Sequence, residues 1–162
     1  MAGIVLSDAS PLIALAQVDG LAWPRTLFGE VRIPPEVEAE VVGDRGFAGE
    51  QAIAAALAAG WLKVAGPVPP EPVLPDLDEG EAACIRLALA ARQPALLLMD
   101  ERAGRAIAQE HGLRVAGTAA VIGMARQRDL IPCAREVFAR LHASDFRISA
   151  EVIATVLTRV GA

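Results

Sequence analysis

Two aspartates follow the two most strand-like segments of the chain. Asp8 follows the apolar run at residues 4–6, and Asp100 follows the apolar run at residues 95–99. In open α/β sheets, ligands bind in the crevice beyond the carboxyl ends of the strands. If the two runs are neighbouring parallel strands, we expect the two carboxylates to lie close together in that crevice.

Two glutamates also stand out by their placement. Glu40 lies one turn after Glu36, on a helix expected to begin at Pro35. Glu81 lies in the first turn of the helix expected after a proline-rich loop. Carboxylates that converge on one crevice repel one another unless divalent cations neutralise them. Ligation by oxygen atoms alone suits Mg²⁺ or Mn²⁺ and not zinc.

Each of these positions also has a purely structural explanation. An aspartate before a helix often caps it, which applies to Asp8 and to Asp100. Asp78 and Glu81 have the spacing of a capping box, so the role of Glu81 could be local. The solvated face of one helix would explain three glutamates together: Glu36, Glu38 and Glu40. The joint placement of the acidic residues favours a metal site.

The elements that must position these residues alternate between strands and helices. Strands are expected at residues 4–6, 31–33, 61–64, 95–99 and 113–116. Helices are expected at residues 10–17, 21–28 with a break at Pro24, 35–42, 47–59, 79–92, 101–111, 118–128, 132–142 and 149–160, with a turn at 43–46. This alternation predicts an α/β fold of three layers, α/β/α, around a central, mainly parallel sheet.

Length and composition favour one domain with a sizeable core. The chain has 162 residues, of which 54% are hydrophobic. We expect a core over about residues 3–130 and C-terminal helices over about 132–160, with the proline-rich residues 66–75 as a surface excursion. No apolar run approaches the roughly 20 residues that span a bilayer, and no basic segment precedes an apolar one at the N-terminus. These features predict a soluble, cytoplasmic protein.

Charge and motifs exclude several classes of function. The net charge of −5 argues against a generic nucleic-acid binder with a globally basic surface, but not against a nuclease with an acidic metal site. No dinucleotide-binding, P-loop or serine-hydrolase motif is present. An aspartyl phosphatase would need a second aspartate where Ser10 stands. Cys84 and Cys133 show no metal-binding spacing and are expected to be reduced thiols.

Five segments, taken in order, resemble the landmarks of PIN domains. They are most similar to the branch with a D-x-S-P-L-I opening and a G-E-A helix start, and the resemblance covers about residues 3–130. The segments are Leu6-Ser7-Asp8-Ala9-Ser10-Pro11-Leu12-Ile13, Ile33-Pro34-Pro35 with Glu40-Val41, Gly80-Glu81-Ala82-Ala83, Leu97-Leu98-Met99-Asp100-Glu101-Arg102-Ala103-Gly104-Arg105-Ala106, and Ala116-Gly117-Thr118. The resemblance implies a metal-dependent nuclease, and many PIN domains are VapC-type toxins that cleave RNA.

The resemblance also assigns expected roles to residues of this chain. The acidic positions that hold Mg²⁺ or Mn²⁺ and carry catalysis fall on Asp8, Glu40, Glu81 and Asp100. Ser10 takes the hydroxyl position beside the first aspartate, and Thr118 stands where many PIN domains carry a further acid or amide. Arg102 and Arg105 are candidates to contact the nucleic-acid backbone, although arginines of a solvated face are common.

The function expected from the sequence is that of a Mg²⁺- or Mn²⁺-dependent ribonuclease. It would be the toxin of a toxin–antitoxin pair, held in check by a small antitoxin protein, and a homodimer. A catalytically silent PIN-like module that binds RNA or a protein is the main alternative. A phosphatase-like hydrolase of small phosphate esters is a third possibility.

Overall fold

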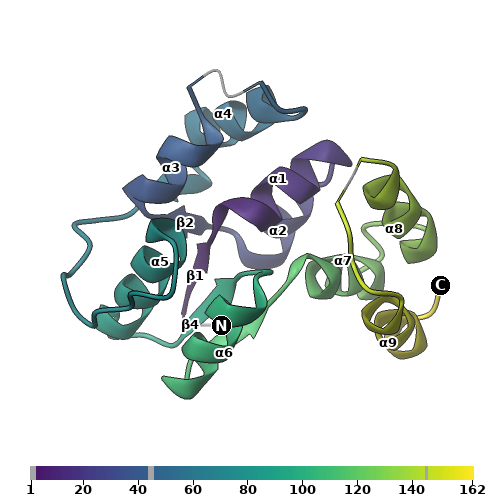
Figure 1. The fold of residues 1–162 in the computed structure, drawn as a ribbon. Coiled ribbons are helices and arrows are strands. Elements are labelled where there is room, and N and C mark those ends of the chain that lie inside the picture. Colours follow the sequence, from purple (N-terminus) through teal and green to yellow (C-terminus); the bar gives the residue numbers. More distant parts are fainter. Residues whose placement is uncertain (1–2, 44–45, 145) are drawn as a thin grey trace.

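A five-stranded parallel sheet forms the centre of the computed structural model, which describes residues 3–43, 46–144 and 146–162 (Figure 1). The strand order is β3-β2-β1-β4-β5. The strands are β1 (Ile4–Ser7), β2 (Val31–Ile33), β3 (Leu62–Val64), β4 (Ala95–Leu98) and β5 (Arg114–Ala116). The α/β prediction is confirmed, and every strand pair within the described sheet is parallel.

The order of the strands reverses between β1 and β4. The chain runs outward from β1 to β2 and β3, then returns to β4 on the other side of β1 and continues to β5. Leu6 is paired with Leu97 at the centre of the sheet, and the Asp8 amide donates to the Leu98 carbonyl oxygen at 2.9 Å. The carboxyl ends of β1 and β4 therefore flank a topological switch point, the place where open α/β sheets bind ligands.

Helices cover both faces of the sheet because each crossover is right-handed, so the face that its helix covers depends on which way the next strand is added to the sheet. The outward crossovers carry α1 (Ala9–Gln17), α2 (Ala22–Phe28), α3 (Pro35–Val41) and α4 (Glu50–Ala59). The opposite face carries α5 (Glu79–Ala90) and α6 (Arg102–Glu110). After β5, α7 (Thr118–Gln127) packs against α2 and α1. The result is the expected three-layer α/β/α arrangement.

Two helices differ from the sequence expectations by more than a shift of one or two residues at an end. The fourth helix begins at Glu50 and not at residue 47, because Gly49 before it adopts a left-handed backbone with φ of +94°. Pro24 does not break α2, since it lies in the first turn, where a missing amide hydrogen costs no helix bond. The turn expected at residues 43–46 lies partly outside the described residues.

Two C-terminal helices form a layer outside α7. They are α8 (Ala134–Ala143) and α9 (Ala150–Val160), which Figure 1 shows beside α7 at the end of the molecule away from β1 and β2. No residue of α9 is fully buried. Gly123 of α7 admits Val156 of α9, since a Cβ at Gly123 would lie 3.0 Å from Val156 Cγ1. In the described part of the chain, no helix is long and apolar enough to cross a membrane.

Candidate metal centre

Asp8 is buried at the junction of β1 and α1, with 5% of its surface exposed. It occupies the N-cap position of α1, but its side chain makes no capping hydrogen bond to that helix. Helix capping therefore does not explain this carboxylate. A buried carboxylate without a structural partner of this kind is costly unless something else satisfies it.

Three carboxylates converge at this junction. Asp8, Glu40 and Asp78 each offer an oxygen, and the three oxygens lie within 4.8 Å of one another. They come from the end of β1, the last turn of α3 and the N-cap of α5. Asp8 is buried, whereas Glu40 and Asp78 are exposed. We call these three residues the acidic trio.

Asp78 is the member of the trio that the sequence assigned only to helix capping. The capping box does form, and Asp78 Oδ1 accepts from the Glu81 amide at 2.8 Å. A carboxylate has acceptor sites on both oxygens, so a capping aspartate can also face a cation. The long crossover from β3 places the N-terminus of α5 over the end of β1. Local sequence patterns do not predict this placement.

Gly80 lets the trio come together. A Cβ on Gly80 would lie 2.8 Å from Glu40 Oε1, 3.0 Å from Asp8 Oδ1 and 3.2 Å from Val37 Cγ2. Glycine in a helix interior costs roughly 1 kcal/mol relative to alanine, so its presence at the second position of α5 is a signal of close approach. From the sequence, that signal indicates that another segment approaches Gly80 closely, but it does not identify the segment.

A Gly80→Ala variant is expected to bind divalent cations at least about tenfold more weakly, because the new methyl group would displace the Asp8 and Glu40 carboxylates that surround it. Calorimetric titration with Mn²⁺ measures the affinity, and circular dichroism checks the fold. The matched control is Gly66→Ala, whose Cβ would have no neighbour closer than 3.8 Å. Unchanged Mn²⁺ affinity in Gly80→Ala would contradict the placement of the site.

Glu81 lies beside the trio, and its two carboxylate oxygens have different surroundings. Its Oε1 accepts from the Asp78 amide at 3.3 Å, so the capping role is real. Its Oε2 is buried and has no hydrogen-bond partner among the described residues. That oxygen faces Gly104, where an added Cβ would approach it to 2.8 Å. Capping alone therefore leaves half of this carboxylate unexplained.

Asp100 is held by a separate set of donors. Its Oδ1 accepts from the Thr118 amide at 2.7 Å, and its Oδ2 accepts from Thr118 Oγ1 at 2.8 Å and from Ser10 Oγ at 3.1 Å. It binds the N-terminus of α7 and not that of α6, whose N-cap is Glu101. The structure does not bring Asp100 into the trio, but Ser10, two residues after Asp8, links the two positions.

A Thr118→Val variant is expected to lower the free energy of unfolding by about 1–3 kcal/mol, because a fully buried hydroxyl that donates to Asp100 would be lost. Urea denaturation measures the change. Thr158→Val, on the exposed side of α9, is the matched control and should change stability little. Equal free energies of unfolding for the two variants would show that the hydrogen bond from Thr118 to Asp100 does not stabilise the fold.

One known protein family matches almost the whole chain. The PIN domain family matches residues 4–162. The chain belongs to the PIN domain family. Neither the curated proteins nor the solved structures include a match to it. PIN domains are generally nucleases that use divalent metals, so the acidic residues at the switch point of this PIN domain are its candidate metal site.

Burial and crowding shift the acid–base behaviour of this PIN domain. The pKa of Asp8 is raised to about 7, chiefly by burial and additionally by the Asp78, Glu81 and Glu40 carboxylates, while the Ala9 amide acts in the opposite direction. The pKa of Glu81 is also raised, first by burial and then by Asp78. A bound cation would reverse these shifts, because opposite charge favours the ionised form.

The donor set of this PIN domain fits a hard divalent cation. The trio supplies oxygen ligands only, and the Gly80 position leaves the space between them open. A buried Glu81 oxygen lacks a hydrogen-bond partner among the described residues. Mg²⁺ and Mn²⁺ are bound in proteins by carboxylates of this kind. Both cysteines are free thiols, and Cys84 is buried with its pKa raised by that burial, so neither supports a zinc site.

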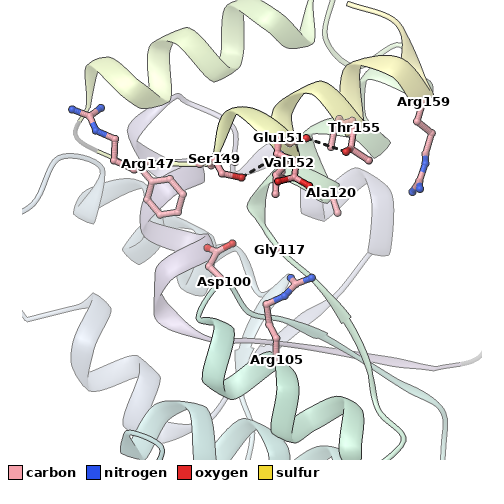
Figure 2. Close-up of a pocket in the computed structure, with 14 residues that line it drawn as sticks. Asp100, Arg105, Gly117, Ala120, Arg147, Ser149, Glu151, Val152, Thr155 and Arg159 are labelled. Carbon is pink, nitrogen blue, oxygen red and sulfur yellow. Dashed lines mark hydrogen bonds between the residues drawn. The ribbon is translucent and has the colours of Figure 1, made fainter.

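The two arginines expected near the nucleic acid lie beside Asp100. Arg102 is exposed, and half-buried Arg105 donates from Nη1 to the Met99 carbonyl oxygen at 3.1 Å. Both line a small surface hollow of about 280 Å³ together with Asp100. Figure 2 shows Arg105 extending from α6 toward Gly117. This position allows Arg105 to meet an anion at the edge of the site.

Proposed function

We propose that this PIN domain is a Mg²⁺- or Mn²⁺-dependent endoribonuclease that hydrolyses phosphodiester bonds. The observation that carries the proposal is the acidic trio, with buried Asp8 at the sheet's switch point and Gly80 leaving room between the carboxylates. Membership of a nuclease family supports the same reading. RNA as the substrate is supported by the resemblance to VapC-type toxins.

The proposal gives different residues different roles in hydrolysis. A divalent cation, when bound, supplies Lewis acidity and positive charge toward the scissile phosphate and the attacking water. Asp8, Glu40 and Asp78 would hold it, with Glu81 beside them. Asp100 is held in one orientation on the neighbouring wall by its hydroxyl donors, Thr118 and Ser10.

The toxin role and the antitoxin partner are suggested by the same resemblance, and the homodimer is suggested by the apolar composition of a small domain. We propose that the chain is the toxin of a toxin–antitoxin pair, that it forms a homodimer, that a small antitoxin protein inhibits it, and that it acts in the cytoplasm. The antitoxin would have to cover the acidic site or the arginines beside Asp100. The alternative from another class is a silent module, which binds RNA or protein without cutting.

Cleavage of labelled RNA tests the proposed function. The purified chain is incubated with single-stranded RNA, structured RNA and single-stranded DNA in EDTA, Mg²⁺ or Mn²⁺. Cuts in RNA that require a divalent cation are expected, and they should disappear in EDTA. No cleavage by folded protein in either metal would overturn the proposal in favour of the silent module. Release of phosphate from small esters, with intact RNA, would favour a phosphatase.

A further inference from the structure

A cavity lies between α7 and α9 and opens beside Asp100. Its volume is about 520 Å³, within the range of roughly 300–1,000 Å³ that small-ligand pockets occupy. We propose that it binds one unstacked guanine nucleotide of the substrate strand. This inference rests on the proposed ribonuclease function, and it adds a base preference that the acidic site does not provide.

Four of the larger side chains that line the cavity are apolar, and we call them the platform. Phe146 and Ile148 come from the segment before α9, and Val152 and Val156 come from α9 itself. Val152 is 44% exposed, although large aliphatic side chains are mostly covered elsewhere in the described structure. Nucleic-acid bases are flat and apolar on both faces, and proteins bind single strands by stacking bases on aromatic side chains. The platform therefore matches the face of a base.

Two carboxylates line the cavity, and Asp100 already accepts hydrogen bonds from Ser10 and Thr118, which leaves Glu151 for edge recognition. Glu151 lines the same cavity, and Figure 2 places Glu151 and Ser149 on the α9 side, with Asp100 and Gly117 opposite. A carboxylate only accepts hydrogen bonds. Among the four RNA bases, guanine alone offers two adjacent donors on its Watson–Crick edge. The other bases pair a donor there with an acceptor that a carboxylate repels. Glu151 therefore favours guanine.

Arginines flank the platform where the phosphates of the strand would run. Arg105 and Arg159 line the cavity from α6 and α9, and Arg147 lines it from the segment between α8 and α9. Figure 2 shows Arg105 and Arg159 at the same end of the cavity. Within the described residues, Arg159 has no hydrogen bond or ion pair. In a chain with a net charge of −5, three arginines around one cavity indicate an anionic ligand.

The position of the cavity connects it to the proposed chemistry. Asp100 and Arg105 line both this cavity and the smaller hollow on α6 that includes Arg102. A strand that crosses Asp100 would therefore place one nucleotide on the platform and its neighbour beside the acidic residues. The expected consequence is cleavage at a fixed step from a guanine.

Nucleotide binding in EDTA tests the cavity without requiring catalysis. The four ribonucleoside 5′-monophosphates are titrated into the full chain by calorimetry. The guanine nucleotide is expected to bind at least about tenfold more tightly than the other three, since one bidentate contact discriminates on that scale. Glu151→Gln should remove most of this preference, and Val152→Asp should weaken binding of all four by placing a charge on the apolar platform. Glu136→Gln, an exposed glutamate on α8, is the matched control.

Mapping of the cut sites in Mg²⁺ completes the test. The wild-type chain should cut at one step from guanines, and Glu151→Gln should spread the cuts among all bases. Equal affinity for the four nucleotides, or no binding, would overturn the guanine pocket even if RNA is cleaved. Guanine-selective binding that Glu151→Gln abolishes would support the pocket even if no RNA is cleaved, in which case the nuclease function fails and the pocket stands.

Discussion

An Asp8→Asn variant is expected to lose metal-dependent RNA cleavage by about a hundredfold or more, the scale on which loss of one preorganised electrostatic group reduces catalysis. Asp8 is the buried member of the acidic trio, and its oxygen lies within 4.8 Å of those of Glu40 and Asp78. An amide has the same shape as a carboxylate but carries no charge to hold a divalent cation. The variant should also bind Mn²⁺ more weakly in calorimetric titration.

The fold of this variant is expected to remain intact, which separates a chemical effect from a structural one. The Asp8 backbone amide, which binds the Leu98 carbonyl oxygen, is unchanged by the substitution. Asp129→Asn is the matched control, because Asp129 is exposed and has φ of +57°, which asparagine tolerates. Full cleavage by Asp8→Asn, equal to that of the control, would remove Asp8 from the site.

The metal-free chain is expected to lose stability as pH rises from about 5 to about 8. The ordinary pKa of the Asp8 carboxyl is 3.8, and in the folded chain it is about 7. Between these values the folded state binds more protons than the unfolded state, so the free energy of unfolding falls with rising pH. The contribution is fully present below the unfolded pKa and is lost as pH passes through the folded pKa. Its size over this range is about 3 kcal/mol.

Thermal unfolding in EDTA at pH 5 and pH 8 measures this effect, and a decrease in Tm on the order of 5–10 °C is expected. Asp8→Asn should remove most of the decrease and should be more stable than the wild type at pH 8 without metal. Addition of Mg²⁺ at pH 8 should restore the wild-type Tm but leave that of the variant unchanged. A Tm that rises with pH in the metal-free wild type would contradict the raised pKa.

Local patterns were sufficient to predict most of the secondary structure. The run at Ala95–Leu98 is apolar throughout and is bounded by Pro94 and Asp100, so it reads as a buried strand. The spacing of Asp78 and Glu81 predicts the capping box that forms at α5. Such signals depend on residues a few positions apart, and the structure differs mainly at boundaries, as at Gly49.

The choice among the glutamates of α3 illustrates what a local pattern leaves open. Glu36, Glu38 and Glu40 all lie on a helix of seven residues, and their spacing alone does not say which faces Asp8. The packing of α3 against α1 and α5 turns Glu40 toward Asp8, where the Gly80 backbone meets both carboxylates. The role of each acidic residue in catalysis stays a prediction until the variants are measured.

The sequence alone was enough to predict the α/β class, a mainly parallel sheet and the position of Asp8 and Asp100 directly after strands, because these follow from hydrophobic periodicity along the chain. That the two strands are neighbours is known only from the tertiary structure. The tertiary structure was needed to show that Asp78 lies with Asp8 and Glu40, and that Asp100 accepts hydrogen bonds from Ser10 and Thr118. The physical reason is that the long crossover from β3 to β4 carries the start of α5 across the sheet, and a contact between residues 8 and 78 depends on the packing of whole helices.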